Sequence, residues 1–292
     1  MDHSLQGAYD LHIHVAPDVI QRKCNDLELA EKVRDAGMKG CVIKCHYFET
    51  AARAALLRSQ FPELEIAGGL ALNLSVGGIN PYAVERFGQM GGGILWFPTM
   101  DARAFQTYKH KEEPDFDGSS YLVATDRQGM LLPETAEVLK LAEKYHMVVA
   151  TGHLSPEEGL CILREARRLG VEHTIVTHVE HPAMQYTDEQ QLEAVRLGAL
   201  IEHSYNNAWF DRCSLPEIVR QIRVVGCEHV IMSTDFGQVN APFSVDGLRE
   251  YAEKLKEYGF SDDELHTMLC RNPGAVLSGI IKKRSSKGKL LD

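Results

Sequence analysis

Short apolar segments alternate with helical segments along almost the whole chain. Each apolar run is followed by residues whose apolar positions recur with helical spacing, and strictly alternating β and α units require a parallel sheet. Nearly every position in the runs is apolar, as in strands that are covered on both faces. The eight predicted strands are residues 8–14, 40–45, 65–72, 93–97, 147–151, 174–177, 199–202 and 230–233.

Eight such units predict an α/β fold of the (β/α)8 TIM-barrel type. A doubly wound open sheet is the alternative, but it usually carries a Gly-x-Gly-x-x-Gly turn after an early strand, and this chain has none there. The three glycines at 91–93 precede a strand, which is the wrong side for a phosphate site. An additional helix is expected beyond residue 261. We expect residues 1–292 to form one barrel domain.

The regular rhythm is interrupted once, after the fourth strand. Residues 101–132 are polar, carry many charges and show no helical period. A loop of this length in a compact domain is usually a functional lid or disordered. The segment is therefore predicted to be either a lid over the site or a solvated surface insertion.

Composition excludes several classes of function. The 292 residues carry a net charge of −10 without a basic run, which disfavours nucleic acid as a partner. No run approaches the roughly 20 apolar residues of a membrane span, and the N-terminus lacks the pattern of a signal peptide. The seven cysteines include no Cys-x-x-Cys pair, so a reducing cytoplasm is expected. The expected partner is a small-molecule substrate, and a homo-oligomer is a reasonable expectation.

The chain has thirteen histidines, and their places in the predicted barrel are uneven. Chemistry in a TIM barrel sits at the C-terminal ends of the strands. Residues at or just beyond those ends are His12, His14, His46, His153, His178 and His203, together with Asp235 after the eighth strand. By contrast, His146, His173 and His229 lie just before strands, at the opposite rim, and are interpreted as structural or surface residues.

His12 and His14 are two residues apart on the first strand, so their side chains point the same way. Two neighbouring buried imidazoles suit a divalent transition metal. One His-x-His pair alone is a weak signal, because a lone buried histidine is usually a satisfied core residue. The convergence of His153, His178 and Asp235 on the same rim makes a metal site the favoured interpretation.

These residues resemble the amidohydrolase superfamily of metal-dependent TIM-barrel hydrolases. That pattern is His-x-His on the first strand, histidines after the fifth and sixth strands, and an aspartate after the eighth. The chain supplies these as His12, His14, His153, His178 and Asp235, and the residues from Arg271 to Leu277 resemble the closing Asn-Pro-Ala helix of that family. The resemblance implies one or two divalent metal ions, most often Zn²⁺, held by these five residues.

The chain departs from this pattern at the fourth strand. Many two-metal members carry a lysine or glutamate there to bridge the metals, whereas this strand ends in residues 96–99 with no such ligand. The second strand instead offers Lys44 and His46 on one side. Lys44 is open to three interpretations: a carboxylated bridging ligand, a clamp for a substrate carboxylate, or an amine with a depressed pKa. The alternative without a role in the chemistry is a structural ion pair with Asp10 or Glu202.

The favoured function is hydrolysis of an amide, ester or lactone by a metal-activated water. Asp235 would accept the proton of that water and return it to the leaving group, while His178 would bind a second metal or stabilise the oxyanion. His203 and His181 are candidates for substrate contact. At the end of the seventh strand either Glu202 or His203 must point inwards, and the position favours His203.

Two other functions remain open. A metal-dependent decarboxylase or a phosphoesterase would use the same barrel. Arginine is scarce near the strand ends, with Arg103 the nearest, which disfavours a doubly charged phosphate. A barrel that only binds a metal or ligand is the third alternative, and Asp235 argues against it because a strand-end aspartate beside histidines has little structural use.

Overall fold

The computed structural model describes residues 5–287, with side chains described up to residue 280. Within this part of the chain, eight parallel strands form one sheet in chain order. They are β1 (Tyr9–Ile13), β2 (Gly40–Ile43), β3 (Glu65–Ala71), β4 (Ile94–Trp96), β5 (Val148–Ala150), β6 (Thr174–Val176), β7 (Ala199–Ser204) and β8 (Val230–Ser233).

The two edges of this sheet meet at a seam between β1 and β8. Ile13 pairs with Phe236 as an isolated parallel bridge, and the amide of His14 donates to the carbonyl of Phe236 at 2.8 Å. One step earlier, the amide of Asp235 donates to the carbonyl of His12 at 2.9 Å. These bonds bring the sheet to a nearly closed barrel, so the predicted (β/α)8 TIM-barrel fold is confirmed.

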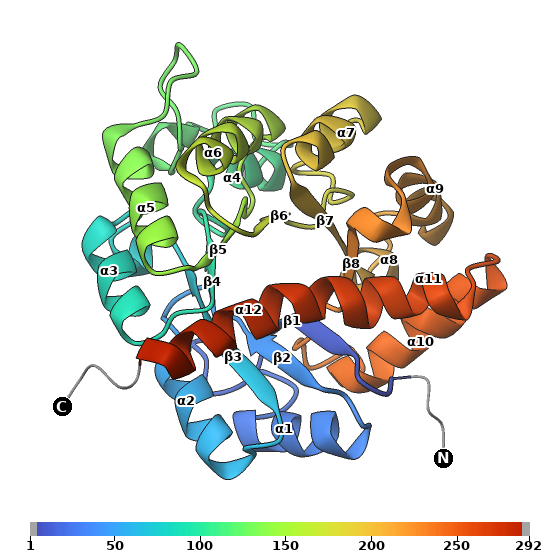
Figure 1. The fold of residues 1–292 in the computed structure, drawn as a ribbon. Helices are drawn as coiled ribbons and strands as arrows, with labels where there is room; N and C mark the ends of the chain where they lie inside the picture. The colour runs from blue at the N-terminus through green and yellow to red at the C-terminus, as the bar shows by residue number, and fades with distance from the viewer. Residues whose placement is uncertain (1–4, 288–292) are drawn as a thin grey trace.

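Helices surround the barrel between successive strands, as Figure 1 shows. The outer helices are α1 (Asp26–Asp35), α2 (Ala51–Gln60), α3 (Pro81–Gln89), α5 (Pro133–Lys144), α6 (Pro156–Leu169), α7 (Asp188–Arg196), α9 (Leu215–Val225) and α10 (Ser244–Glu257). Several begin at residues that satisfy their free amides. Asn25, Ser155 and Thr187 each form a capping box with the Glu or Gln three residues later. Local sequence and barrel topology therefore agree on where these helices start.

A last helix, α12 (Asn272–Lys287), crosses one end of the barrel (Figure 1). It follows the short α11 (Asp262–His266) and the π-helical turn η4 (Thr267–Arg271). Val276, Leu277 and Ile280 pack in one cluster with inward side chains from the first halves of several strands, among them Leu11 and Val42. The helix thus closes the N-terminal end and leaves the C-terminal end for a site. No helix in the described part of the chain has both the length and the apolar character needed to span a membrane.

The first strand contains a register shift between Asp10 and Ile13. Leu11 packs in the barrel interior with Val42, yet the next residue, His12, also faces inwards, where it contacts other site residues. A bulge lets two successive side chains take the same face, and bulges are frequent beside active sites. The carboxylate of Asp10 accepts the displaced His12 amide at 3.1 Å. The bulge is what turns His12 and His14 into the barrel.

The insertion after β4 is not structureless, which corrects the expectation that residues 101–132 lack a helix. It contains α4 (Arg103–Lys109) and the 3-10 turn η2 (Gly118–Ser120). The Arg103 side chain donates to the backbone carbonyls of Gly118 and Ser119, at 3.0 and 3.4 Å. The insertion is also tied to the outer helix α6, because the Ala124 amide donates to a carboxylate oxygen of Glu158 at 2.7 Å. Seven residues were too few for their helical period to stand out against the polar surroundings.

Gly237 allows the loop after β8 to lie against β1. Its φ is +153°, and a Cβ built there would lie 2.0 Å from the carbonyl oxygen of His14. We expect Gly237→Ala to destabilise the protein by about 3 kcal/mol or more, because both the backbone angle and the close contact oppose a side chain. The measurement is the free energy of unfolding in urea.

Gly259→Ala is the matched control. Gly259 also has a positive φ of +80°, but a Cβ there would meet nothing within 4 Å. Its cost should be only the left-handed backbone term of about 1–2 kcal/mol. Equal losses in the two variants would show that the seam does not need the close approach.

Candidate metal centre

Three side chains meet at the C-terminal mouth of the barrel, across the seam between β1 and β8. They are His12, His14 and Asp235, and one potential ligand atom from each lies within 4.8 Å of the other two. The Nε2 atoms of both histidines are 3.1 Å from Oδ1 of Asp235. Two imidazoles and one carboxylate are a donor set suited to a divalent transition metal.

An orphaned nitrogen supports this interpretation. His14 Nε2 is buried, and although it lies close to Asp235 it makes no hydrogen bond of acceptable geometry. Buried polar atoms are nearly always satisfied, so an unpartnered ring nitrogen beside a carboxylate points to a cation site. The residues present therefore fit a metal ion.

Glu202, on β7, fixes the orientation of His12. The Nδ1 of His12 donates to Oε1 of Glu202 at 2.9 Å, and both side chains are buried. The other oxygen of Glu202 accepts the backbone amide of His178 at 3.3 Å. A metal-ligating histidine commonly donates its second nitrogen to a carboxylate, which leaves Nε2 with its lone pair towards the metal. One buried carboxylate thus positions residues from β1 and from the end of β6.

Lys44 lies deep in the same cluster. Its Nζ is 2.8 Å from His12 Nε2, a distance that requires one proton between the two nitrogens. It also lies 5.1 Å from the centre of the Trp96 ring. Burial lowers the pKa of Lys44 to about 8. No ion pair links Lys44 to Asp10 or to Glu202 in the described part of the chain, so its nearest partner is a histidine.

A second pair of histidines lies beside the first three residues. His153, after β5, and His178, after β6, face each other with their Nε2 atoms 3.1 Å apart. The Nδ1 atoms of both rings are buried and unpartnered. The ring centre of His178 is 5.8 Å from that of His12, so this histidine pair lies directly beside the group formed by His12, His14 and Asp235. Two facing acceptor nitrogens can share one proton or hold a cation.

His46 and His181 complete the cluster. The His46 ring stacks on His14 at 4.6 Å, and its Nδ1 is 2.8 Å from Oγ1 of Thr99. The His181 ring is 5.5 Å from His178. From the insertion, the ring of Phe105 lies 4.8 Å from His153. The insertion therefore covers the histidines, although its role as a lid stays a prediction.

Two residues of the cluster have unusual backbone angles. Asp235 has φ of +52° and His178 has φ of +24°, and neither is a glycine. Such conformations persist only where the surroundings impose them, and they concentrate at functional sites. This strain agrees with the placement of both residues in the cluster.

The neutral state of most of these histidines follows from burial. Desolvation lowers the pKa of His14 to about 3, and it also lowers the pKa values of His46, His153 and His178. For His12, burial and Lys44 act downwards, but the carboxylates of Asp235 and Glu202 outweigh them and raise the pKa to about 9. The histidines hold the pKa of Asp235 well below its usual range against the effect of burial. His14 and Asp235 thus have the protonation states that a metal ion requires, whereas His12 would release a proton when the ion binds.

The predicted site residues come together with one exception. His12, His14, Lys44, His46, His153, His178, His181 and Asp235 all lie in the cluster described above. The expectation that His203 points inwards was wrong: Glu202 faces His12, while Nδ1 of His203 contacts Glu180 at 3.0 Å on the other side of β7. Every position before Glu202 in this strand is apolar, so the sequence did not indicate which of the two residues, Glu202 or His203, faces the barrel interior.

Two arginines near the site were missed. Arg22, in the loop after β1, pairs with the buried Asp18 at 2.6 Å and brings Nη2 to 3.3 Å from His14 Nδ1. Arg212, in the loop after β7, bonds Asn206, whose side chain also bonds the backbone of Asp235. The expected nearest arginine, Arg103, instead holds the insertion together. Arg22 and Arg212 were missed because they lie several residues beyond a strand end in the sequence. Their loops fold back and bring both side chains close to the mouth.

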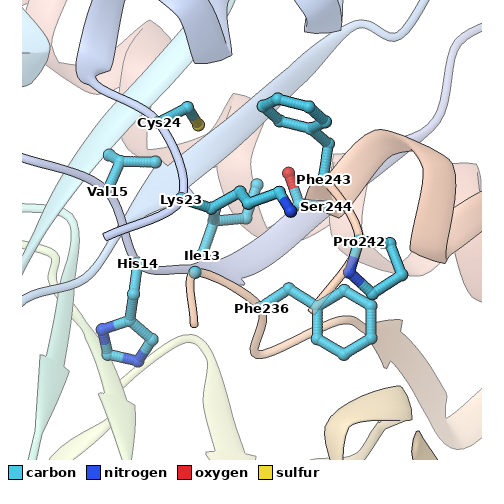
Figure 2. A pocket seen from close by; sticks show the side chains of 10 residues that line it. Ile13, His14, Val15, Lys23, Cys24, Phe236, Pro242, Phe243 and Ser244 are labelled. Carbon is cyan, nitrogen blue, oxygen red and sulfur yellow. The ribbon is translucent and has the colours of Figure 1, made fainter. Parts of the chain in front are cut away.

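A small recess lies behind β1, outside this cluster. It is lined by Ile13, His14, Val15, Lys23, Cys24, Phe236, Gly237, Pro242, Phe243 and Ser244. Figure 2 shows the imidazole of His14 directed away from Lys23 and Phe243, and the Nζ of Lys23 lies 5.5 Å from the centre of the Phe243 ring. The recess is therefore separate from the metal centre, and its side chains offer no second ligand set.

Solved structures with the same fold include metal-containing enzymes. An amidohydrolase from Pseudomonas aeruginosa aligns with a TM-score of 0.60 and 14% identity, over 95% of this chain and 97% of that one. An amidohydrolase from Burkholderia multivorans with bound zinc gives 0.56 and 8%, over 93% and 99%. A dihydroxybenzoic acid decarboxylase from a Polaromonas species, with bound manganese and 2-nitroresorcinol, gives 0.55 and 11%, over 94% and 97%. At these identities the likeness shows a shared fold.

One family model matches the chain by sequence. It is described as a family of unknown function, DUF6282, and it covers residues 7–202. No curated protein matches the sequence. The matched range contains the four histidines of the expected pattern and ends before its aspartate, Asp235.

Replacing Glu202 tests the positioning of His12. We expect Glu202→Gln to weaken Zn²⁺ binding by about 10- to 100-fold, because the neutral amide no longer favours the Nδ1–H form of His12. The measurement is a competition titration against a chelator of known affinity. Glu180→Gln is the matched control, since Glu180 is a buried partner of a histidine that is not in the cluster. Equal affinities in wild type and Glu202→Gln would contradict this role.

The buried histidines also predict how stability changes with pH. Histidines whose pKa is lowered in the folded state bind protons only after unfolding, so their contribution is full above pH 6.5 and is lost as the pH falls towards the folded pKa. His14, His46, His153, His178 and His181 all shift this way, and only His12 shifts upwards. Chelator-treated protein should therefore melt about 5 °C or more lower at pH 5.5 than at pH 7.5. The measurement is differential scanning calorimetry, and a midpoint that stays constant or rises would contradict the expectation that the five lowered histidines outweigh the opposite shifts of His12 and Asp10.

Proposed function

Because the chain belongs to the DUF6282 family, whose description names no reaction, we propose its activity from the site itself: metal-dependent hydrolysis of an amide, ester or lactone bond in a small molecule. The observation that carries this proposal is the meeting of His12, His14 and Asp235 at the C-terminal mouth. Active sites of TIM-barrel enzymes lie at this end. The shared fold with amidohydrolases of solved structure supports the same reaction class.

The nitrogens His12 Nε2 and His14 Nε2 and a carboxylate oxygen of Asp235 would hold a divalent ion, with His153 and His178 as the second candidate pair. When bound, such an ion supplies Lewis acidity and brings the pKa of a coordinated water towards about 7. Zinc and manganese are the ions named for the solved structures above, and this donor set suits either.

Asp235 is the residue placed to move the proton. Its Oδ1 faces both histidines, and its Oδ2 makes no hydrogen bond with another described residue. The side chain is 18% exposed, whereas His12 and His14 are almost fully buried. An ionised carboxylate that reaches the mouth can accept a proton from water on one side and return it to a leaving group.

The remaining cluster residues orient and enclose the reacting groups. Glu202 holds the Nδ1 proton of His12, and Thr99 fixes the ring of His46. Phe105 covers His153 with an apolar ring and so limits water at that side. Because five of the histidines are neutral, His178 can present either a lone pair or an N–H towards a developing negative charge.

A non-hydrolytic decarboxylation is the second candidate function. It is favoured by the absence of a bridging acid or lysine at the end of β4, where Trp96, Phe97 and Thr99 are buried, and by the fold shared with a dihydroxybenzoic acid decarboxylase. It would need no water as nucleophile, only a general acid at the carbon that loses CO₂. The Lys44–His12 pair carries a proton that could serve that role.

Asp235→Asn tests both candidates. We expect this variant to lose about 100-fold or more of the activity on its best substrate, because the amide cannot accept a proton. The measurement is turnover on a panel of lactones, amides, esters and benzoic acids, with product acid and released CO₂ followed separately. Product acid would establish hydrolysis, and CO₂ would establish decarboxylation.

Asp115→Asn, in the insertion, is the control for general effects of losing a carboxylate. Elemental analysis of wild type, purified without added metal or chelator, should find a transition metal that is lost in His12→Ala. A wild type that neither contains nor takes up metal would refute the metal-dependent reaction. Full activity of Asp235→Asn would refute its role in proton transfer.

A further inference from the structure

Arg212 is held at the mouth of the site by a short chain of hydrogen bonds. Asn206, in the helix α8 (Tyr205–Trp209), donates from Nδ2 to the backbone carbonyl of Asp235 at 2.9 Å. The side-chain oxygen of the same Asn206 accepts from Nη1 of Arg212. The backbone amide of Arg212 donates to the carbonyl of Asn207 at 2.8 Å. One amide side chain therefore links the guanidinium to the residue proposed to transfer the proton.

No carboxylate neutralises Arg212 in the described part of the chain. Its guanidinium is exposed and lies 5.2 Å from the ring of Phe210. A guanidinium has five N–H donors, and only the bond to Asn206 uses them. The exposed Arg164 and Arg220, by contrast, each pair with a carboxylate at 2.6 Å. Arg212 is thus a fixed cation with donors to spare.

His181 offers a second donor at the same rim. Its Nδ1 accepts the backbone amide of Ala183 at 3.1 Å, so the neutral ring must carry its proton on Nε2. Burial lowers the pKa of this ring to about 3, and the nearby positive charge of Arg212 acts in the same direction, so the ring stays neutral. Nε2 makes no hydrogen bond with another described residue. Its N–H therefore has no acceptor in the protein.

The charges of the cluster also favour an anion. Asp235 and Glu202 are the carboxylates that face it, and Lys44 offsets one of them. Arg22 is already paired with the buried Asp18. A divalent ion in the proposed site would leave the cluster with a net positive charge before Arg212 is counted. An anionic group would meet two unsatisfied donors, and Asp235 is the one described carboxylate of the cluster that reaches the mouth, where the proposed metal ion would offset its charge.

We propose that the substrate is a small carboxylic acid whose carboxylate is bound by the guanidinium of Arg212 and by Nε2–H of His181. This inference rests on the proposed function for its substrate, but the anion site itself is made of residues outside the metal ligands. One guanidinium and one neutral imidazole suit a singly charged carboxylate. The rings of Phe105 and Tyr108 lie 5.9 and 5.8 Å from His181, so a flat apolar body can follow the carboxylate.

The test is the binding of benzoate and of its neutral analogue benzamide, by isothermal titration calorimetry. Wild-type protein should bind benzoate more tightly than benzamide. Arg212→Gln should weaken benzoate binding by about tenfold, which corresponds to about 1.4 kcal/mol, and should leave benzamide binding unchanged. Arg212→Lys should retain an intermediate affinity, because it keeps the charge without the fork of donors. Arg86→Gln is the control, since Arg86 is an exposed helical arginine bonded to Gln89 on α3.

Three results would overturn the proposal: no preference of the wild type for benzoate, wild-type affinity in Arg212→Gln, or an equal loss in Arg86→Gln. An equal loss of benzamide and benzoate would mean that Arg212 only supports the loop, which also overturns it. If Arg212→Gln lowers the thermal midpoint, Arg212→Lys replaces it in the test. The proposal then requires that Arg212→Lys binds benzoate more weakly than wild type and binds benzamide equally well.

The same titrations with chelator-treated protein separate this proposal from the metal-dependent reaction. A preference for benzoate that depends on Arg212 without metal supports the anion site, whatever the metal content proves to be. A loaded metal site in a protein without that dependence overturns the anion site and leaves the metal-dependent reaction standing.

Discussion

The metal centre depends on one buried carboxylate that is not a ligand. Asp10 accepts the amide of His12 at 3.1 Å and the hydroxyl of Thr234 at 2.5 Å, so it joins the bulge of β1 to the end of β8. Without the bulge, His12 would alternate with the inward-facing Leu11 and point to the outer face. Without the tie to Thr234, the next residue, Asp235, would not be held beside the histidines. Burial raises the pKa of Asp10 to about 7, although these hydrogen bonds act against that rise. The geometry of the ligands is therefore fixed by the strand seam before any metal binds.

The fold and the ligand order were predictable because both follow from periodicity along the chain. Strand ends in a parallel barrel meet at one rim, so His12, His153 and Asp235 could be placed together from the sequence alone. Residues that act through the third dimension were not predictable. The inward face of Glu202 depends on strand parity that uniformly apolar neighbours conceal. Arg212 reaches the mouth only because α8 folds the chain back, and no motif marks such a loop.

Burial and charge divide the cluster into two parts. The deep part is nearly solvent-free, holds most of its histidines neutral and concentrates its negative charge on Asp235 and Glu202. The rim part, with Arg212 and His181, offers N–H donors that no described residue accepts. A chain with a net charge of −10 thus carries the unpaired cation Arg212 beside the proposed site. The attraction of this cation for an anion acts at short range and is screened by salt, so it selects among ligands at the mouth rather than across the whole surface.

The position of helix α12 limits the routes by which a ligand can enter and leave the barrel. Val276, Leu277 and Ile280 seal the barrel floor, and the interior above them is filled by side chains such as Trp96. In the described part of the chain these side chains fill the N-terminal end of the barrel, so a ligand that enters from the C-terminal side would leave the same way. Substrate and product then compete for one passage beneath the insertion. If the proposed reaction takes place here, its product would leave by the way its substrate enters, so inhibition by product is an expected property of this architecture.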